Sequence, residues 1–453
     1  MDAMTSAVSI QRYTDETFPA FGVNKKQEIS RLLFEIVRRD GCPVQAVLPE
    51  RVQQSCSFRQ VKAFLTKRRY PNMPAFQRRG LQRFLKIPEP CPIPDAESKA
   101  CHFKPKRILV EEPLLADPLA QRLRRMLPGV PIELVVSYKQ YCRQQAFSVA
   151  EYNRRAEVFF VVREKHQFWQ ACPCSKGSVS CGYAVLNLGQ GCPFDCTYCF
   201  MQGYLNSPGI VFPSNINDFF RSLEAHGGPW RIGTGQFSDS LALDHFTEYS
   251  RHIIHFMRRH PDWFFEFKTK SDNISLLLEE DSSPNVCVGW SLNPERVVAR
   301  DEQGTASLEQ RLAAAQKCAG RGWRVSFHFD PIVYDEGWEE EYRGVVRRLF
   351  EAVPPERMAW ISLGCLRMMP RLKQVMESRF PASRILGGEL VPGYDGKLRY
   401  PLNVRRTIYK SMLNSIREED EGVPVYLCME QTEAWEGLPL ERRLDRAVFS
   451  RRQ

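Results

Sequence analysis

The sequence contains no long hydrophobic run. No stretch approaches the roughly 18 consecutive apolar residues of a membrane-spanning helix. Residues 1–16 mix polar and acidic residues and lack the apolar segment of a secretory signal. Both absences predict a cytoplasmic protein with no membrane partner. In such a protein, 15 cysteines indicate metal binding, catalysis or buried thiols, because disulfides are rare in reducing compartments. We therefore expect no disulfides.

Acidic residues are fewer than basic ones, 53 against 63, which gives a net charge of +10. Residues 1–102 carry about +7 of this excess, from about 17 basic and 10 acidic residues. A basic module of this kind suits nucleic acid phosphates, although a solvated surface explains the charge equally well. A hydrophobic fraction of 43% is ordinary for a globular protein, and 453 residues are enough for two domains.

Residues 1–102 are predicted to form a small, mainly helical N-terminal module with a linker. Apolar residues recur at helical spacing from Asn24, the expected cap, to Arg39, and Gly41 lies just beyond. A second helix is expected over residues 57–69. Residues 87–105 are rich in proline and lack periodicity, so we interpret them as the linker.

From about Lys106 the pattern changes to strands that alternate with helices, which is typical of a parallel sheet covered by crossover helices. Six strands are expected, over residues 183–188, 230–233, 264–269, 286–292, 323–329 and 359–363. We predict an α/β fold in which residues 183–365 form a partial (β/α)6 barrel of the TIM type. Residues 103–182 precede this barrel, and residues 366–453 form a C-terminal region. The ligand site of such a barrel lies at the C-terminal ends of its strands.

Cys192, Cys196 and Cys199 form a C-x3-C-x2-C triplet directly after the first predicted strand. Three thiolates satisfy three irons of a cubane cluster and leave the fourth iron open to a bound molecule, whereas a structural zinc site closes with four ligands. A zinc ribbon with a fourth ligand from Cys172, Cys174 or Cys181 is the alternative. Zinc ribbons favour paired C-x2-C knuckles, and the chain has one such pair. The spacing therefore favours a 4Fe-4S cluster with an open iron.

Polar residues gather at the ends of the predicted strands. They are Gly233, Thr234, Gly235, Ser238 and Asp239 after the second strand, Lys270 after the third, Ser291 and Asn293 at the end of the fourth, and Asp330 at the end of the fifth. A row of polar groups along one rim packs poorly unless a polar ligand binds there, although strand ends commonly lead into polar loops. The pattern predicts a ligand site at this rim.

Taken together, these motifs resemble the spore photoproduct lyase family, within the radical S-adenosylmethionine superfamily. The similarity covers roughly residues 103–435. Its segments are GCPFDCTYCFMQGYL, RIGTGQFSDSLALDH, FKTKSDN, WSLNPE, FHFDPIVYDEGW, ISLG, DGKLRY and YLCME. Eight segments in the same order are far more specific than the cysteine triplet alone.

The resemblance implies a cofactor and the residues that hold it. The three cysteines would bind a 4Fe-4S cluster whose open iron binds S-adenosylmethionine. Further contacts to that molecule would come from Gly233, Gly235, Ser238, Lys270, Ser291, Asn293 and Asp330. In the family, an electron from a donor such as flavodoxin or ferredoxin reaches the cluster. The reduced cluster then cleaves S-adenosylmethionine to methionine and a 5'-deoxyadenosyl radical, which removes hydrogen from the substrate.

The resemblance also implies a nucleic acid substrate. Arg399 and Tyr400 match the pair that contacts a thymine dimer in DNA in that family. A guanidinium beside an aromatic ring suits a flipped base. A structural salt bridge is an equally good explanation of Arg399.

The sequence departs from the family where a hydrogen atom returns to the product radical. The lyase uses a cysteine just before the Ser-Asp of the second strand loop, and this chain has Gln236 there, whose amide N–H bond is too strong to replace a thiol. Tyr198, before the last cluster cysteine, is retained as an expected catalytic residue, but Phe200 stands where the lyase has another tyrosine. Cys365, at the end of the sixth strand, is the candidate substitute donor, and a buried small hydrophobe is the alternative.

A second group of cysteines, Cys172, Cys174 and Cys181, precedes the barrel with the spacing C-x-C-x6-C. These thiols could hold an auxiliary iron–sulfur cluster or a metal, with a fourth ligand from elsewhere, or they could be free.

For the whole chain we expect a radical enzyme that acts on a damaged or modified base in DNA. Two alternatives stay open: the same chemistry on a peptide or small molecule, and a noncatalytic, metal-stabilised protein that binds nucleic acid.

Overall fold

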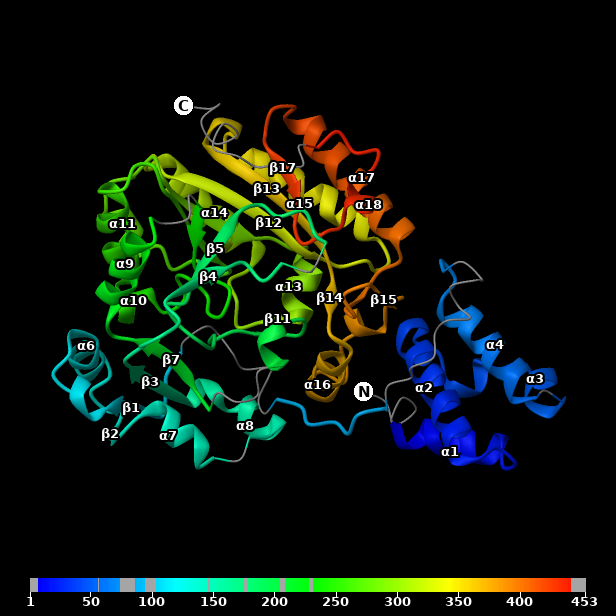
Figure 1. The fold of residues 1–453 in the computed structure, drawn as a ribbon. Coiled ribbons are helices and arrows are strands. Elements are labelled where there is room, and N and C mark those ends of the chain that lie inside the picture. The colour runs from blue at the N-terminus through cyan, green and yellow to red at the C-terminus, as the bar shows by residue number, and fades with distance from the viewer. Residues whose placement is uncertain are drawn as a thin grey trace. The chain divides into compact units, whose positions relative to one another are not determined.

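The computed structural model describes residues 7–55, 57–73, 86–93, 103–145, 147–174, 177–203, 208–227 and 231–440. Part of the predicted linker and Trp230 of the second predicted strand lie outside these ranges. The chain divides into two compact units (Figure 1). Unit 1 comprises residues 1–93, 333–336 and 366–407, and unit 2 comprises residues 94–332, 337–365 and 408–453. In the described part of the chain, no helix is long and apolar enough to span a membrane.

The N-terminal part of unit 1 is helical, as the sequence predicts. Its helices are α1 (Ala7–Thr17), α2 (Val23–Asp40), α3 (Glu50–Ser55) and α4 (Phe58–Arg69). Helix α2 buries the apolar stripe that the spacing predicts, and it ends at Gly41, whose left-handed conformation (φ 66°) lets its N–H donate to the Val37 carbonyl. The helix starts at Val23 with Gly22 at the cap position, so the prediction that Asn24 is the cap is wrong.

Residues 366–407, which the sequence grouped with the C-terminal region, pack in unit 1 with these N-terminal helices. They form β14 (Arg367–Met368), α16 (Pro370–Arg379), β15 (Val391–Pro392), β16 (Leu398–Arg399) and the start of α17 (Leu402–Glu419). The three short strands make an antiparallel sheet in the order β14-β16-β15. Unit 1 is thus assembled from segments that are far apart in the sequence.

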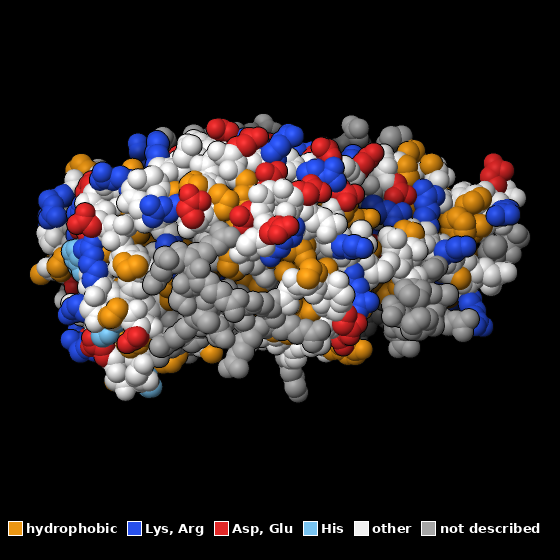
Figure 2. Space-filling model, turned by 90° about the horizontal axis from the view of Figure 1, so that it is seen from above, with side chains coloured by type: hydrophobic (Ala, Val, Ile, Leu, Met, Phe, Trp, Pro, Cys, Tyr) orange, Lys and Arg blue, Asp and Glu red, His pale blue; other side chains and the backbone are white. Residues whose placement is uncertain are grey.

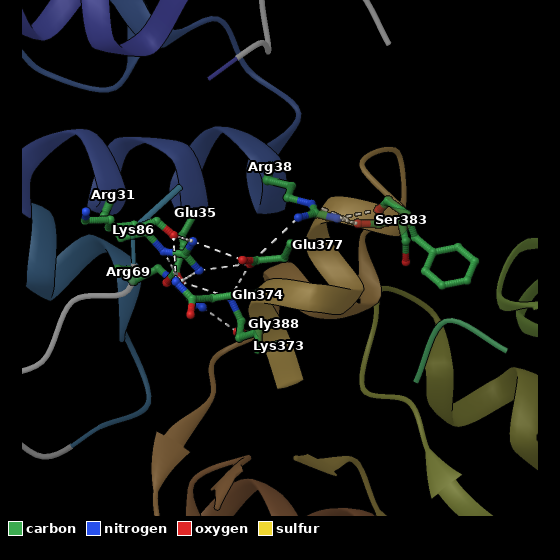
Figure 3. A network of polar contacts seen from close by, with 11 residues as sticks. Arg31, Glu35, Arg38, Arg69, Lys86, Lys373, Gln374, Glu377, Ser383 and Gly388 are labelled. Carbon is green, nitrogen blue, oxygen red and sulfur yellow. Dashed lines mark hydrogen bonds and ion pairs between the residues drawn. The ribbon is translucent and has the colours of Figure 1, made fainter. Parts of the chain in front are cut away.

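A buried ion network joins α16 to α2 and α4 (Figure 3). The Glu35 carboxylate accepts from Arg31 at 2.7 Å, from Arg69 at 2.6 Å and from Lys373 at 3.0 Å. Glu377 accepts from Arg31 at 2.9 Å and from Lys373. Each of these five side chains is at most 10% exposed, so the charges depend on one another for stabilisation.

An eight-stranded sheet forms the main body of unit 2, in the order β17-β13-β12-β10-β9-β8-β5-β4. Its strands are β4 (Trp169–Ala171), β5 (Tyr183–Leu186), β8 (Arg231–Gly233), β9 (Phe264–Thr269), β10 (Val286–Ser291), β12 (Arg324–Ile332), β13 (Met358–Cys365) and β17 (Val425–Leu427). All are parallel to their neighbours except β4. Six of these strands, namely β5, β8, β9, β10, β12 and β13, correspond to the six predicted strands. The predicted partial barrel is therefore confirmed. Strands β4 and β17 extend its two edges.

Crossover helices connect the barrel strands, as a parallel sheet requires. They include α9 (Ile216–Ala225), α10 (Asp244–Thr247), α11 (Tyr249–Arg258), α12 (Ser275–Glu279), α13 (Glu295–Asp301), α14 (Leu308–Gly320) and α15 (Trp338–Ala352). Figure 1 shows α9, α10 and α11 at one side of the sheet. Helix α14 packs on β10 and β12 and begins with the predicted Ser307 cap, whose hydroxyl accepts from the Gln310 N–H.

Residues 103–213 contribute a second, smaller parallel sheet in the order β2-β1-β3-β7. Its strands are β1 (Arg107–Glu111), β2 (Ile132–Val135), β3 (Val158–Val162) and β7 (Ile210–Pro213), with α6 (Pro118–Met126), α7 (Tyr138–Arg143) and α8 (Val149–Asn153) between them. The predicted alternation of strands and helices from Lys106 is therefore present. Strand β7 follows the cysteine triplet in the sequence, so the triplet loop connects the two sheets of unit 2.

Candidate active site

The cysteine loop is fixed by backbone pairing before and within the triplet. Gln190 and Val211 of β7 exchange backbone hydrogen bonds of 2.9 and 2.7 Å. The next residue, Gly191, has a φ of 93°, and a Cβ at this position would lie 3.2 Å from the Cα of Ile210, so the turn requires glycine. Farther on, β6 (Asp195–Cys196) pairs antiparallel with β11 (Glu302–Gln303). These two pairings hold the loop between β7 and β11.

The structure brings the three triplet cysteines together. Cys192, Cys196 and Cys199 pack in one cluster with Phe194 and Ala242. Burial raises the pKa of Cys196 well above its ordinary value; Lys270 opposes this shift, while Glu302, Cys199 and Cys192 add to it. Burial, Asp239 and Cys199 likewise raise the pKa of Cys192. Three mutually interacting thiols in a water-poor loop resist ionisation unless a cation or a metal centre compensates the charge.

Two cations flank these thiols. Arg155 forms an ion pair of 3.2 Å with Asp195 and donates to the Phe194 carbonyl at 2.7 Å. The ammonium of Lys270 lies 5.7 Å from the ring centre of Tyr198. Burial raises the pKa of Cys199, and both cations act in the opposite direction. A cation beside a thiol favours the thiolate, which is the form that binds metal.

The Tyr198 hydroxyl belongs to a buried hydrogen-bond network. It bonds to Glu302, whose carboxylate also accepts from Asn293 at 2.8 Å and from Arg311 at 2.5 Å. The Asn293 oxygen accepts from the Tyr342 hydroxyl at 2.6 Å. Burial and the neighbouring Glu302 raise the pKa of Tyr198 well above its ordinary value, so Tyr198 stays protonated. The network fixes Tyr198 beside the last cysteine of the loop.

Of the other polar residues predicted for the rim, Lys270 and Ser291 lie at the strand ends as predicted, whereas Asp330 does not end its strand. Asn293 is fully buried and engages both ends of its amide in the network around Tyr198. Ser291 is buried at the end of β10, where its carbonyl accepts from Arg311 at 2.9 Å. The prediction that Asp330 ends its strand is wrong, because β12 continues to Ile332. Lys270 directly follows β9, as predicted.

The glycines at and just after the end of β8 are required by close packing of the protein itself. A Cβ on Gly233 would lie 1.9 Å from the Tyr183 hydroxyl, and one on Gly235, whose φ is 90°, would lie 2.6 Å from the Lys268 carbonyl. Gly235 and Ser238 line a small pocket beside the ends of β5 and β8. The turn is therefore held tightly against β9 while Ser238 faces a pocket.

Three predicted site residues have partners that the sequence did not reveal. Cys365 is 1% exposed at the end of β13, and its backbone N–H donates to the Tyr409 hydroxyl at 2.9 Å. In unit 1, Arg399 forms a two-pronged ion pair with Asp395 at 2.7 and 2.9 Å. Tyr400 is also buried in unit 1, and its hydroxyl accepts from the Tyr334 N–H at 3.1 Å. The salt-bridge alternative for Arg399 is thus present in the structure.

The residues around the triplet fit a bound polar group. The buried side-chain oxygens of Thr197, Gln236 and Gln303 have no hydrogen-bond partner among the described residues. These positions lie in the triplet loop, beside the glycine turn and on the strand paired with the loop. Buried polar atoms normally have partners, so a ligand with donors that reach them would complete the site.

Within the described ranges, no three His, Cys, Asp or Glu side chains are arranged to hold one metal ion. A cubane distributes its thiolates over several irons, so it does not need that compact arrangement.

Sequence reasoning missed the groups that support the triplet. Arg155 lies 37 residues before Cys192, and Glu302 lies 104 residues after Tyr198. Arg311 and Tyr342 reach the network from α14 and α15. None of these residues belongs to a short motif, so local spacing carries no signal for them.

Comparison with known proteins agrees with this geometry. The family model for spore photoproduct lyase matches residues 103–390. The spore photoproduct lyases of Geobacillus sp. and Bacillus subtilis are 27% and 26% identical over 295 residues, which is 62% of this chain and 84% of each relative.

Solved structures show the same fold. A cysteine-to-alanine mutant of spore photoproduct lyase has a TM-score of 0.62 at 24% identity, over 72% of this chain and 99% of that one. A double mutant with bound AdoMet and dinucleoside spore photoproduct has a TM-score of 0.60 at 24% identity, over 73% and 99%. The matched family model spans more than half of the sequence and includes the cysteine triplet. The chain therefore belongs to the spore photoproduct lyase family of radical S-adenosylmethionine enzymes.

Proposed function

We propose that this protein is a radical S-adenosylmethionine enzyme that removes hydrogen from a damaged or modified base in DNA. The observation that carries the proposal is the gathering of Cys192, Cys196 and Cys199 in one loop at the rim of the partial barrel. Three thiolates leave one iron of a cubane cluster open for a cofactor. The substrate class rests on the relatives, one of which has been solved with dinucleoside spore photoproduct.

In this proposal Cys192, Cys196 and Cys199 hold a 4Fe-4S cluster. When bound, such a cluster would supply the electron for reductive cleavage of S-adenosylmethionine, which is the chemistry that allows hydrogen to be removed from the substrate. We propose a small reductant such as flavodoxin or ferredoxin as the electron source. Lys270 is placed to neutralise a carboxylate, because its ammonium lies beside the triplet and Tyr198.

The remaining rim residues divide into contacting and positioning groups. Gly233, Gly235 and Ser238 would contact the cofactor through backbone groups and the Ser238 hydroxyl at the pocket. Asn293 would act through Tyr198 and Glu302, because its own amide is already bonded. Ser291 and Asp330 complete the set of contacts proposed for the rim. Arg399 and Tyr400 are the proposed contacts to the base.

The step that returns hydrogen to the product radical differs from that of a lyase with a thiol donor. Gln236 stands at the donor position with a buried oxygen that has no partner among the described residues. The Tyr198 hydroxyl is bonded to Glu302, and Cys365 is 1% exposed. We infer that a thiol which donates hydrogen to the product radical, Cys365 included, would have to become accessible to that radical during turnover. The alternative is that the product radical is not reduced by a thiol, so the final product differs from that of the lyase.

The test is anaerobic reconstitution with iron and sulfide, followed by reaction with dithionite, S-adenosylmethionine and ultraviolet-treated DNA. The proposal predicts that 5'-deoxyadenosine release rises several-fold when the damaged DNA is added, and that mass spectrometry finds an altered base. Untreated DNA of the same sequence is the control. Cleavage of S-adenosylmethionine that no DNA stimulates would contradict the DNA substrate and favour a peptide or small molecule.

A further inference from the structure

A second group of cysteines lies apart from the triplet in unit 2. Cys172 and Cys174 follow β4, Cys181 precedes β5, and Cys428 directly follows β17. The first three are close in sequence, whereas Cys428 is more than two hundred residues farther along. The fold therefore adds a fourth thiol that sequence spacing does not associate with this group.

Backbone pairing brings the two segments together. The Cys172 N–H donates to the Tyr183 carbonyl at 2.8 Å, which fixes the start of the segment beside β5. The Val179 N–H donates to the Glu430 carbonyl at 3.0 Å, and Ser178 pairs antiparallel with Gln431. The segment between β4 and β5 thus joins the chain just after β17, although β4 and β17 are opposite edges of the sheet. This pairing closes the gap between the two edges.

The four thiols interact at this junction. The thiol of Cys172 is hydrogen-bonded to that of Cys174, and this bond, with burial second, raises the pKa of Cys172. Negative charge on Cys428 and Cys181 also acts on the same thiol, so both lie near it. All four side chains are only partly buried. Free thiols rarely gather in fours without forming disulfides or binding metal.

A buried cation lies beside this group. The Arg231 guanidinium is fully buried at the start of β8 and donates to the Tyr426 hydroxyl at 3.1 Å. Arg231 and Tyr426 both interact with Cys181, and Tyr426 interacts with Cys428 as well. Four thiolates around a cluster carry net negative charge, and a nearby buried guanidinium compensates such charge.

We propose that Cys172, Cys174, Cys181 and Cys428 bind a second iron–sulfur cluster. Four cysteines are the complete ligand set of such a cluster. Every iron that faces the protein is then occupied, so this centre differs in kind from the triplet and does not bind S-adenosylmethionine. A cluster is favoured over a zinc ion because no three such side chains in the described ranges are arranged about one ion. The centre would also tie the edge segment before β5 to the segment after β17.

The test separates the two cysteine groups by mutation. In a variant with Cys192→Ala, Cys196→Ala and Cys199→Ala, reconstituted anaerobically with iron and sulfide, we expect about two to four bound irons per chain and the visible absorbance of a cluster. Adding Cys172→Ala and Cys428→Ala should remove this iron. Adding Cys318→Ala, a buried cysteine of α14, should leave it unchanged. Circular dichroism confirms that each variant is folded.

The triplet variant can overturn the proposal in two ways. One is that it is folded but holds no iron after reconstitution, and the other is that it holds zinc in place of iron at the four cysteines. If the triplet variant does not fold, the proposal is tested by comparing the iron content of the unmutated protein with that of a single variant. The iron content should fall by about a third to a half when Cys428→Ala alone is introduced, whereas equal iron content in both would also contradict the second cluster. None of these measurements involves DNA or cleavage of S-adenosylmethionine. Their outcome therefore tests the second cluster independently of the proposed function.

Discussion

The cations of the buried network in unit 1 and Lys270 of unit 2 differ in whether their charges are paired with carboxylates. In unit 1, Arg31, Glu35, Arg69, Lys373 and Glu377 pair with one another (Figure 3). In unit 2, half-buried Lys270 lies beside the Tyr198 ring and interacts electrostatically with Cys196, Glu302 and Asp239, but its ammonium makes no hydrogen bond or ion pair with the residues that the structure describes. The difference shows that buried charge alone does not identify a site. The informative feature is a half-buried ammonium that makes no direct ion pair among the described residues and lies beside three thiols.

Surface charge is less informative than these buried groups. On the face shown in Figure 2, Lys and Arg side chains alternate with Asp and Glu side chains. The net charge of +10 is therefore not gathered in one patch on that face. The DNA substrate must be tested by reaction and not by charge.

The largest expected effect follows from removing one ligand of the triplet. Cys196→Ala should lower the release of 5'-deoxyadenosine to background, because two thiolates do not retain a cluster with an open iron. Product release is measured by liquid chromatography after reduction with dithionite. Cys318→Ala is the matched control and should retain cleavage. Cleavage that survives Cys196→Ala would remove the triplet from the reaction.

The next largest effect should be on stability and should leave cleavage intact. Glu377→Ala leaves Arg31 and Lys373 buried with fewer anionic partners, so we expect a loss of about 3–5 kcal/mol in the free energy of unfolding of unit 1. Glu340→Ala removes an exposed ion pair and should change stability by less than about 0.5 kcal/mol. Urea denaturation followed by circular dichroism compares the two. Equal stability of both variants would show that the buried network contributes little.

Lys270→Met should weaken binding of S-adenosylmethionine by roughly ten- to one-hundredfold, because a charged hydrogen bond contributes about 1.5–3 kcal/mol. The iron content should stay unchanged, which separates loss of cofactor binding from loss of the cluster. Lys317→Met, on the exposed side of α14, is the control. Isothermal titration with the anaerobic holoprotein measures both. Unchanged affinity would place the carboxylate of the cofactor elsewhere.

Lowering the pH should reduce the stability of unit 1, because the buried carboxylates of Glu35 and Glu377 become protonated. Burial tends to raise the pKa of Glu35 and Glu377, but Lys373 and the arginines lower both below their ordinary values. Because the folded-state pKa is the lower one, the stabilisation is present above about pH 4.3, the ordinary value for Glu, and is lost as the pH falls below it. Urea midpoints between pH 6 and pH 3 should fall more steeply for the unmutated protein than for Glu377→Ala. Parallel curves would contradict this assignment.

The smallest expected effect on cleavage comes from Gln236→Cys. The substitution introduces a thiol at the position of the missing hydrogen donor, so the rate of 5'-deoxyadenosine release should change little while the product mixture shifts. Gln236→Ser, which adds no thiol, is the control. Mass spectrometry of the base products distinguishes them. Identical products from both variants would mean that this position does not face the product radical.

The sequence predicts local features well and distant partnerships poorly. The triplet fits within eight residues and the barrel strands have strong apolar patterns, so both are visible without a structure. The packing of residues 366–407 with the N-terminal helices depends on ion pairs such as that between Glu35 and Lys373, 338 residues apart. The association of Cys428 with Cys172 depends on closure of the sheet edges. Such contacts follow from tertiary packing, which local periodicity does not encode.

The open iron at the triplet is tested most directly by electron paramagnetic resonance of the reduced, reconstituted protein before and after addition of S-adenosylmethionine. A variant with Cys172→Ala and Cys428→Ala removes any signal from the second cysteine group. We expect S-adenosylmethionine to change the spectrum of the remaining cluster, because the molecule binds the iron that no cysteine coordinates. A cluster spectrum that stays the same at saturating S-adenosylmethionine would contradict the account.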